Sequence, residues 1–144
     1  MQITRFTDYS LRALMYLAIH GDRLCTVKEV AKYYNISQNH LVKVVHRLSQ
    51  LGYIKSSKGK GGGICLLKKP ENINLKELVV NLEPNLTLVE CFDDANNNCF
   101  ISNVCGLKKI MHESLDAFTD TLGKYTVADT ISQPNIFPIA NKDS

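Results

Sequence analysis

Residues 26–52 contain two short amphipathic helix signals separated by only a few residues, a pattern that few folds accommodate. Thr26 and Glu29 have the spacing of a capping box, which predicts a first helix as far as about residue 34. Ser37 can cap a second helix, whose apolar residues recur at helical spacing until Gly52 ends it. Two helices joined by so short a turn indicate a helix-turn-helix.

The second predicted helix begins with polar residues that suit contacts to DNA bases. In a helix-turn-helix this helix enters the major groove, where Gln and Asn can pair with adenine and Lys with guanine or phosphate. An ordinary polar helix face is the alternative for any single residue, but the arrangement as a whole favours DNA reading. The residues predicted to contact DNA here are Ser37, Gln38, Asn39, His40 and Lys43.

Residues 53–67 read as two short strands around a Gly- and Lys-rich tip. The tip is not a nucleotide P-loop, because Gly61 follows Lys60 where that motif requires Ser or Thr. A hairpin after a recognition helix is typical of the wing of a winged helix-turn-helix. Its glycines would let the backbone approach DNA, and Lys58 and Lys60 could reach phosphates or the narrow groove. A flexible surface turn is the alternative.

The charge of the chain is divided between its halves. Residues 1–70 hold twelve Lys and Arg against three Asp and Glu, whereas residues 71–144 hold five against eleven. A basic first half favours a polyanionic partner, of which double-stranded DNA is the usual one, with a solvated basic surface as the alternative. We find no secretory signal and no apolar run long enough to span a membrane, and therefore expect a cytoplasmic protein without a membrane partner.

Three of the five cysteines, Cys91, Cys99 and Cys105, lie within fifteen residues of a loop rich in Asn and Asp. An odd count without a secretory signal argues against a disulfide framework. The spacing lacks the close pairs of a structural zinc site. Iron–sulfur clusters are commonly held by four thiolates, so three would leave one iron to a weaker ligand. Three unremarkable thiols are the alternative. Cys25 and Cys65 lie on apolar faces and are predicted to be core residues.

The sequence predicts helices on either side of these features. Thr7 can cap a first helix before the helix-turn-helix, and Asn74 can cap a short one through about residue 82. The regular apolar stripe after Gly106 predicts a long helix that packs against its copy in a homodimer, with packing inside the same chain as the alternative. The sequence contains neither a Ser/His/Asp order nor an HExxH motif, so these patterns give no indication of an enzyme.

The predicted fold class is therefore mainly α: a winged helix-turn-helix with a β-hairpin wing and a long dimerisation helix. The predicted divisions are a DNA-binding domain at 1–83, whose first helix also contacts the cluster region, a cysteine loop at 84–106, a dimerisation region at 107–132 and a flexible tail at 133–144.

Several separated segments together resemble the bacterial winged-helix transcription regulators that carry an iron–sulfur cluster. They are residues 1–14, 37–44, 61–64 and the cysteine loop. Within that family, residues 82–84, 88–91 and 125–129 are most similar to the nitric-oxide-sensitive repressors. The resemblance covers about residues 1–132, joins its motifs in order, and implies a homodimeric repressor of operator DNA rather than an enzyme.

The resemblance also implies the cofactor and the signal. The expected cofactor is a 2Fe–2S or 4Fe–4S cluster ligated by Cys91, Cys99 and Cys105. Asp8, on the first helix of the same chain or of the partner subunit, is the candidate fourth ligand, with a first-turn carboxylate favoured by the helix dipole as the alternative. Reaction of the cluster with nitric oxide would release the DNA. A related regulator that senses cluster supply, iron or redox state is the alternative function.

Two positions depart from the family pattern. The gap between Cys91 and Cys99 is longer than usual, which leaves the cluster type open, and Lys58 stands where the wing often has Arg. The regulators of cluster assembly have a His three residues after the third cysteine, and this chain has Lys108 there.

Overall fold

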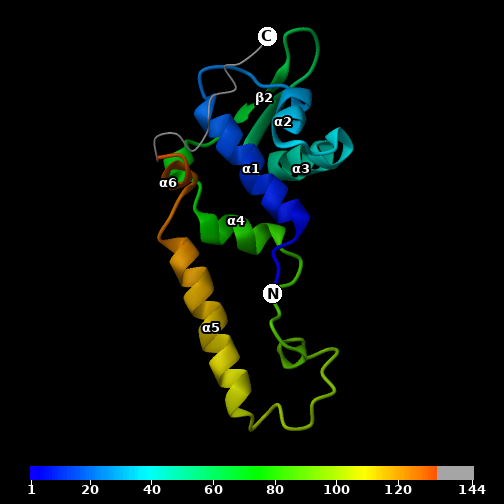
Figure 1. Ribbon diagram of the computed structural model, residues 1–144, viewed down its shortest axis with the longest axis vertical. Helices are drawn as coiled ribbons and strands as arrows, with labels where there is room; N and C mark the ends of the chain where they lie inside the picture. The colour runs from blue at the N-terminus through cyan, green and yellow to red at the C-terminus, as the bar shows by residue number, and fades with distance from the viewer. Residues whose placement is uncertain (133–144) are drawn as a thin grey trace.

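The computed structural model describes residues 1–132, and the predicted tail at 133–144 lies outside them. It consists of helices with one two-stranded antiparallel sheet, which confirms the predicted fold class (Figure 1). The elements are α1 (Arg5–Ile19), α2 (Val27–Tyr34), α3 (Gln38–Gln50), β1 (Ile54–Ser57), β2 (Gly63–Leu66), η1 (Pro70–Asn72), α4 (Leu75–Leu82), η2 (Glu90–Phe92), α5 (Gly106–Gly123) and α6 (Val127–Thr130).

The helix-turn-helix forms from α2 and α3, and both helices pack against each other while α1 packs against α3. Thr26 and Glu29 form the predicted capping box. Asn35 makes the turn in the left-handed conformation, with φ 54°, which Asn tolerates better than most residues. Ser37 lies at the N-cap of α3, although its side chain makes no capping hydrogen bond. The fully buried residues at this junction include Leu14, Val30, Leu41, Val44 and Leu48.

The first helix begins earlier than the sequence predicts. Thr4 is its N-cap and its hydroxyl accepts the backbone N–H of Thr7 at 3.3 Å, so the expectation that Thr7 caps the helix is wrong. Thr7 instead lies inside α1 with no exposed surface. Two hydroxyl residues three apart both suit a cap, and Thr4, the one that caps α1, also has a distant contact described below.

The wing is the hairpin of β1 and β2, in which Lys55 pairs with Cys65 and Ser57 with Gly63. Ile64 also exchanges two backbone hydrogen bonds with Cys25, which fastens the hairpin to the loop before α2. Cys25 is fully buried, as predicted. Cys65 is only half-buried, because it lies on the open face of this narrow sheet, so its prediction as a core residue is wrong.

Helix α5 leaves the winged-helix part and extends along the molecule to the cysteine loop at its far end (Figure 1). Its C-terminal half packs in the same chain: the Asn74 side chain donates to the Gly123 carbonyl at 2.9 Å, and Lys76 pairs with Asp120. Its N-terminal half leaves Leu107 and Ile110 about 60% exposed. Within residues 1–132 no helix is both long and apolar enough to cross a membrane.

Candidate nucleic-acid interface and cysteine loop

The start of α3 presents the predicted DNA-contacting residues to solvent. Ser37, Gln38, Asn39, His40 and Lys43 are all exposed. Leu41, Val44 and Leu48 on the opposite side of the same helix are fully buried. This division fixes the rotation of α3, so the polar residues at its start are available to a ligand. Val42 is the apolar exception on the open side, at 49% exposure.

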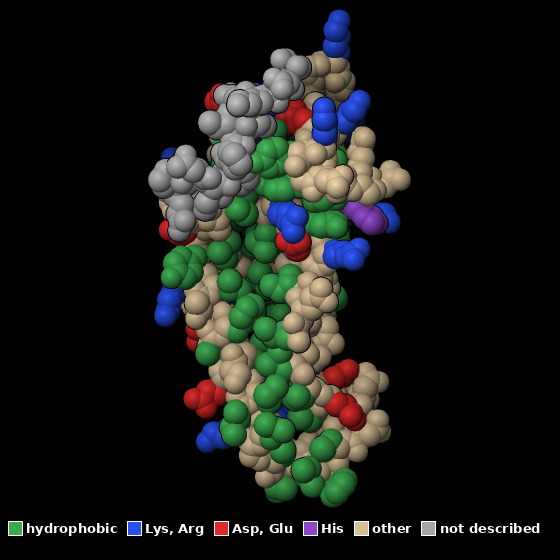
Figure 2. All heavy atoms as spheres, viewed as in Figure 1, with side chains coloured by type: hydrophobic (Ala, Val, Ile, Leu, Met, Phe, Trp, Pro, Cys, Tyr) green, Lys and Arg blue, Asp and Glu red, His purple; other side chains and the backbone are tan. Residues whose placement is uncertain are grey.

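The tip of the wing is built by glycines. Gly59 and Gly61 have φ values of 93° and 79°, which side chains rarely adopt. A Cβ on Gly62 would lie 2.3 Å from the Ser57 carbonyl oxygen, so this position has no room for one. The resulting tight turn leaves Lys58 and Lys60 exposed. In the face shown in Figure 2, Lys and Arg side chains gather around the winged-helix end, whereas hydrophobic side chains form a band toward the cysteine loop.

The three clustered cysteines lie along an irregular segment between α4 and α5. Cys91 is buried within η2, whereas Cys99 and Cys105 are half-buried, and all three are free thiols. Cys105 is the N-cap residue of α5. Among residues 1–132, His, Cys, Asp and Glu side chains form no converged group of three or more that could hold a metal. The donor set has the chemistry of an iron–sulfur site, but the loop does not bring the thiols together in this structure.

Amide and carboxylate side chains hold the loop instead. Glu90 accepts the Asn98 N–H at 2.6 Å, and the Asn97 side chain accepts the N–H of Cys99 at 2.9 Å. A hydrogen bond from Asn96 lowers the pKa of Asp93. The ring of Phe92 stacks on His112, with centroids 3.8 Å apart, and so ties η2 to α5. Sequence reasoning identified the cysteines but missed these loop contacts, for which the run of Asn and Asp was the only signal.

Asp8, the candidate fourth ligand, is held by another residue. Arg12 donates two hydrogen bonds to its carboxylate, at 3.0 and 2.8 Å, one turn farther along α1. The side chains of both residues are 42% exposed. The Arg12 guanidinium also lies over the rings of Tyr9 and Tyr34, about 6 Å from each centroid. The structure therefore does not bring Asp8 to the cysteines, and the carboxylate would have to exchange Arg12 for a metal.

A contact that the sequence did not reveal joins the cysteine loop to α1. Glu83 ends α4 and precedes the loop, and its Oε1 accepts the Thr4 N–H at 2.8 Å and the Thr4 hydroxyl at 3.0 Å. Thr4 is also the N-cap of α1. The two residues are 79 positions apart, so no local pattern could have found the pair. We call this contact the Glu83–Thr4 latch.

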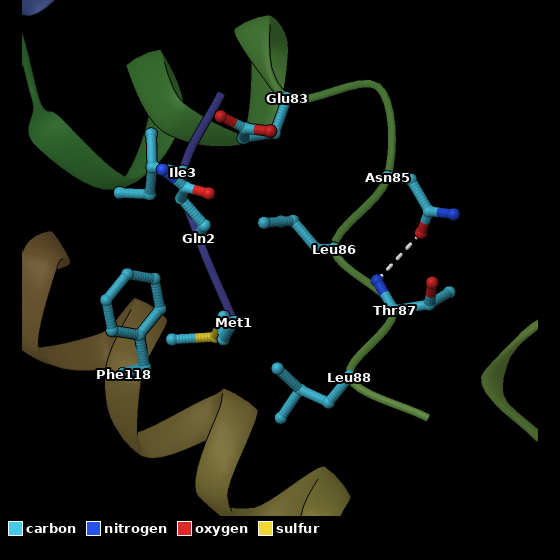
Figure 3. A pocket seen from close by; sticks show the side chains of 9 residues that line it. All are labelled: Met1, Gln2, Ile3, Glu83, Asn85, Leu86, Thr87, Leu88 and Phe118. Carbon is cyan, nitrogen blue, oxygen red and sulfur yellow. Dashed lines mark hydrogen bonds between the residues drawn. The ribbon is translucent and has the colours of Figure 1, made fainter. Parts of the chain in front are cut away.

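The first residues of the chain lie next to the latch, between the loop and α5. A cavity of about 90 Å³ there is lined by Met1 and Ile3 from the N-terminus, by Leu86 and Leu88 from the loop, and by Phe118 from α5. Figure 3 shows these side chains around the same space, with Glu83 at its edge. The start of α1, the root of the cysteine loop and the long helix therefore meet at one place.

Comparison with known proteins assigns the family. The sequence model of the Rrf2 family, described as iron-dependent transcriptional regulators, matches residues 3–133. This chain belongs to the Rrf2 family. Its Rrf2 relatives include the HTH-type transcriptional regulator NsrR of Halalkalibacterium halodurans, which is 50% identical over 133 residues, 92% of this chain and 91% of that protein. NsrR of Bacillus subtilis is 48% identical over 132 residues, 91% of this chain and 90% of that protein.

Solved structures agree with the Rrf2 assignment. CymR, described as the global cysteine regulator of B. subtilis, is 26% identical with a TM-score of 0.74, and the match covers 92% of this chain and 97% of that one. The family and the relatives' names confirm a winged-helix transcription regulator and the expectation that the chain is not an enzyme. They also confirm the resemblance, within this family, to the transcriptional regulators named NsrR.

Proposed function

We propose that this Rrf2-family protein binds operator DNA as a homodimer and releases it when nitric oxide reacts with an iron–sulfur cluster. The observation that carries the proposal is the position of the cysteine loop. Its root at Glu83 is hydrogen-bonded to the cap of α1, and α1 packs on the helix that presents Gln38, Asn39 and His40. A change in the loop therefore has a short physical route to the DNA-reading surface.

Cys91, Cys99 and Cys105 are the thiol ligands in this proposal, and the cluster they hold would supply iron for nitric oxide to bind. The three residues lie on one loop between the end of α4 and the start of α5, so a cluster held by all three thiolates would fix the conformation of that loop. Asp8 would supply the fourth, oxygen donor. Arg12 donates two hydrogen bonds to this carboxylate in the structure and would remain its alternative partner when the metal is absent.

The homodimer in the proposal forms through the projecting half of α5. Leu107 and Ile110 are exposed on this helix, and Val104 precedes them at 86% exposure. A second copy covering this face would remove these exposed apolar side chains from water. An inverted-repeat operator requires the two reading helices of such a dimer to lie about one turn of DNA apart. Ile110→Glu is expected to give monomers in sedimentation velocity.

The DNA part is tested with an operator duplex selected from a random-sequence pool by the purified protein. Asn39→Ala is expected to relax sequence preference and to cost about 1–3 kcal/mol on the selected duplex. Lys58→Ala and Lys60→Ala are expected to lower the affinity for the selected duplex and for a scrambled duplex by the same factor. Both variants are also expected to reduce the salt dependence of binding. If the Asn39 and Lys58 variants lost the same affinity on the selected duplex and on the scrambled one, the roles of Asn39 in base reading and of Lys58 in phosphate contact would be contradicted.

The sensing part is tested on protein purified without oxygen. An absorption spectrum with iron and sulfide analysis measures the cluster, and nitric oxide is then titrated into the DNA complex. Serine at Cys91, Cys99 or Cys105 is expected to abolish the cluster, whereas Cys65→Ser is the matched control that keeps it. Asp8→Ala is expected to retain a cluster that is lost sooner. DNA that stays bound through full reaction with nitric oxide, but leaves on iron removal or oxidation, would assign the alternative signals.

A further inference from the structure

We propose that a hollow between α1 and α3 binds a backbone phosphate of the operator, and that Arg5 is the residue that holds it. The inference rests on the DNA-binding function proposed above. It extends the interface beyond the helix-turn-helix and the wing to the first helix of the chain, which sequence analysis did not connect with DNA.

The hollow has a volume of about 290 Å³ and lies beside the reading end of α3. It is lined by Arg5, Phe6 and Tyr9 from α1 and by His40, Lys43 and Val44 from α3. His40 and Lys43 also belong to the predicted DNA-contacting surface. A DNA strand that borders the groove entered by α3 would therefore pass over the mouth of this hollow.

The lining divides into a polar rim, whose cations are Arg5 and Lys43, and an apolar floor. Arg5, Lys43 and the neighbouring His40 are exposed, whereas Phe6 and Tyr9 are half-buried and Val44 is fully buried. This combination matches one nucleotide of a DNA backbone: the phosphate would meet the cations, and the C–H groups of the sugar would lie against the rings. The planar guanidinium of Arg is well suited to two parallel hydrogen bonds with a phosphate.

The positive charge at the rim is not neutralised by the protein. No acidic residue lines the hollow, and within the described part of the chain Arg5 and Lys43 take part in no ion pair. Asp8 is the nearest acid to Arg5 in sequence, but both of its oxygens accept hydrogen bonds from Arg12. An anion in the hollow would therefore meet uncompensated charge.

Helix stability gives no reason for a cation at this position. Arg5 is the first residue of α1, where the positive end of the helix dipole disfavours positive side chains. Replacing Arg5 with Ala is thus expected to leave the melting temperature unchanged or slightly higher. An effect on DNA binding would then come from a lost contact and not from a weakened fold.

The experiment measures DNA affinity by fluorescence anisotropy over a series of salt concentrations, with the cluster-loaded dimer on the selected operator and on a scrambled duplex. One lost phosphate contact lowers the slope of log affinity against log salt by about 0.9 per protomer, which is about a fivefold loss of affinity per protomer at 0.15 M salt. Arg5→Ala should show this loss on both duplexes. Arg5→Lys should keep most of the slope, and Lys124→Ala, an exposed lysine after α5, is the matched control.

The outcomes separate this inference from the proposed function. Wild-type protein that binds neither duplex would refute the DNA-binding function itself. Wild-type binding with an unchanged salt slope in Arg5→Ala would overturn only the phosphate site. A loss confined to the selected operator would overturn it as well, because a backbone contact does not distinguish sequences. A uniform loss of affinity with an unchanged or slightly higher melting temperature, restored by Arg5→Lys, is the supporting result.

Discussion

The Glu83–Thr4 latch is the contact whose removal most directly tests how the cysteine loop reaches the DNA-reading helices. The perturbation is Glu83→Ala, which deletes the acceptor of two hydrogen bonds from Thr4, at 2.8 and 3.0 Å. After the deletion the Thr4 hydroxyl keeps a partner in Thr7, at 3.2 Å. The Thr4 backbone N–H keeps none within the described residues, and the α1 cap loses its anchor to the loop.

The expected magnitude follows from this geometry. A hydrogen bond to a charged acceptor contributes about 1.5–3 kcal/mol, but the two bonds here share one oxygen and both residues are partly exposed, so we expect a loss of about 1–2 kcal/mol. If the latch carries the signal, the same free energy is missing from the coupling between the loop and the DNA. The ratio of cluster-loaded to cluster-free DNA affinity should then fall about 5- to 30-fold.

The assay combines two measurements on each variant. Urea unfolding gives the stability of the metal-free protein, and anisotropy gives DNA affinity before and after cluster removal. Amide hydrogen exchange at residues 4–8 gives a third readout that needs no cluster, and exchange there should become faster. Glu83→Gln keeps an acceptor oxygen and should recover about half of the stability loss. Glu71→Ala, an exposed acid without a side-chain partner among the described residues, is the matched control.

Two results would refute this reasoning. Unchanged stability and unchanged exchange in Glu83→Ala would mean that the latch contributes nothing to the fold. A loss of stability with the wild-type affinity ratio would mean that the latch only supports the structure, and that the loop communicates with α1 by another route.

Three further predictions concern the winged helix. Cys25 should resist alkylation at pH 8 in native protein, because burial raises the pKa of its thiol to about 11. Mass spectrometry measures the modification, and alkylation of Cys25 as fast as that of Cys65 would contradict the burial of Cys25. Burial raises the pKa of Glu29, but hydrogen bonds from Thr26 and Arg23 outweigh it and leave the pKa lowered. The stability that Glu29 adds is therefore complete above the ordinary value of 4.5 and is lost as pH falls through the folded-state pKa. Urea unfolding of wild type and Glu29→Gln should thus differ at pH 7 and converge in acid, and a difference independent of pH would contradict this. Gly62→Ala should distort the wing and lower both melting temperature and DNA affinity, because its Cβ would meet backbone at 2.3 Å, whereas Gly21→Ala makes only ordinary contacts.

Local signals predicted the winged helix well because each of its parts depends on neighbouring residues. The capping box of Thr26 and Glu29 needs only a three-residue spacing. The buried stripe of α3 follows from helical periodicity, and the glycines at the wing tip follow from the backbone angles of a tight turn. Asn74 caps α4 for the same local reason. The family resemblance added the functional assignment to these elements.

The long helix shows where a local pattern stops being decisive. Its apolar stripe predicted packing against a second copy, with packing in the same chain as the alternative. The structure divides the stripe: Phe118 and Leu122 pack within the chain, whereas Leu107 and Ile110 stay exposed. Periodicity states which face of a helix is apolar, but it cannot state what covers that face.

The sequence alone determined the helix-turn-helix, the wing, the trio of clustered thiols and the family, because periodicity, caps, turn residues and motif order are properties of neighbouring positions. The tertiary structure decided which threonine caps α1, that Asp8 is held by Arg12, that Glu83 joins the loop to the first helix, and that Arg5 shares a hollow with α3. These contacts depend on how α1, α4 and α5 are placed in space. That placement is set by the burial of side chains far apart in the chain, which no short stretch of sequence records.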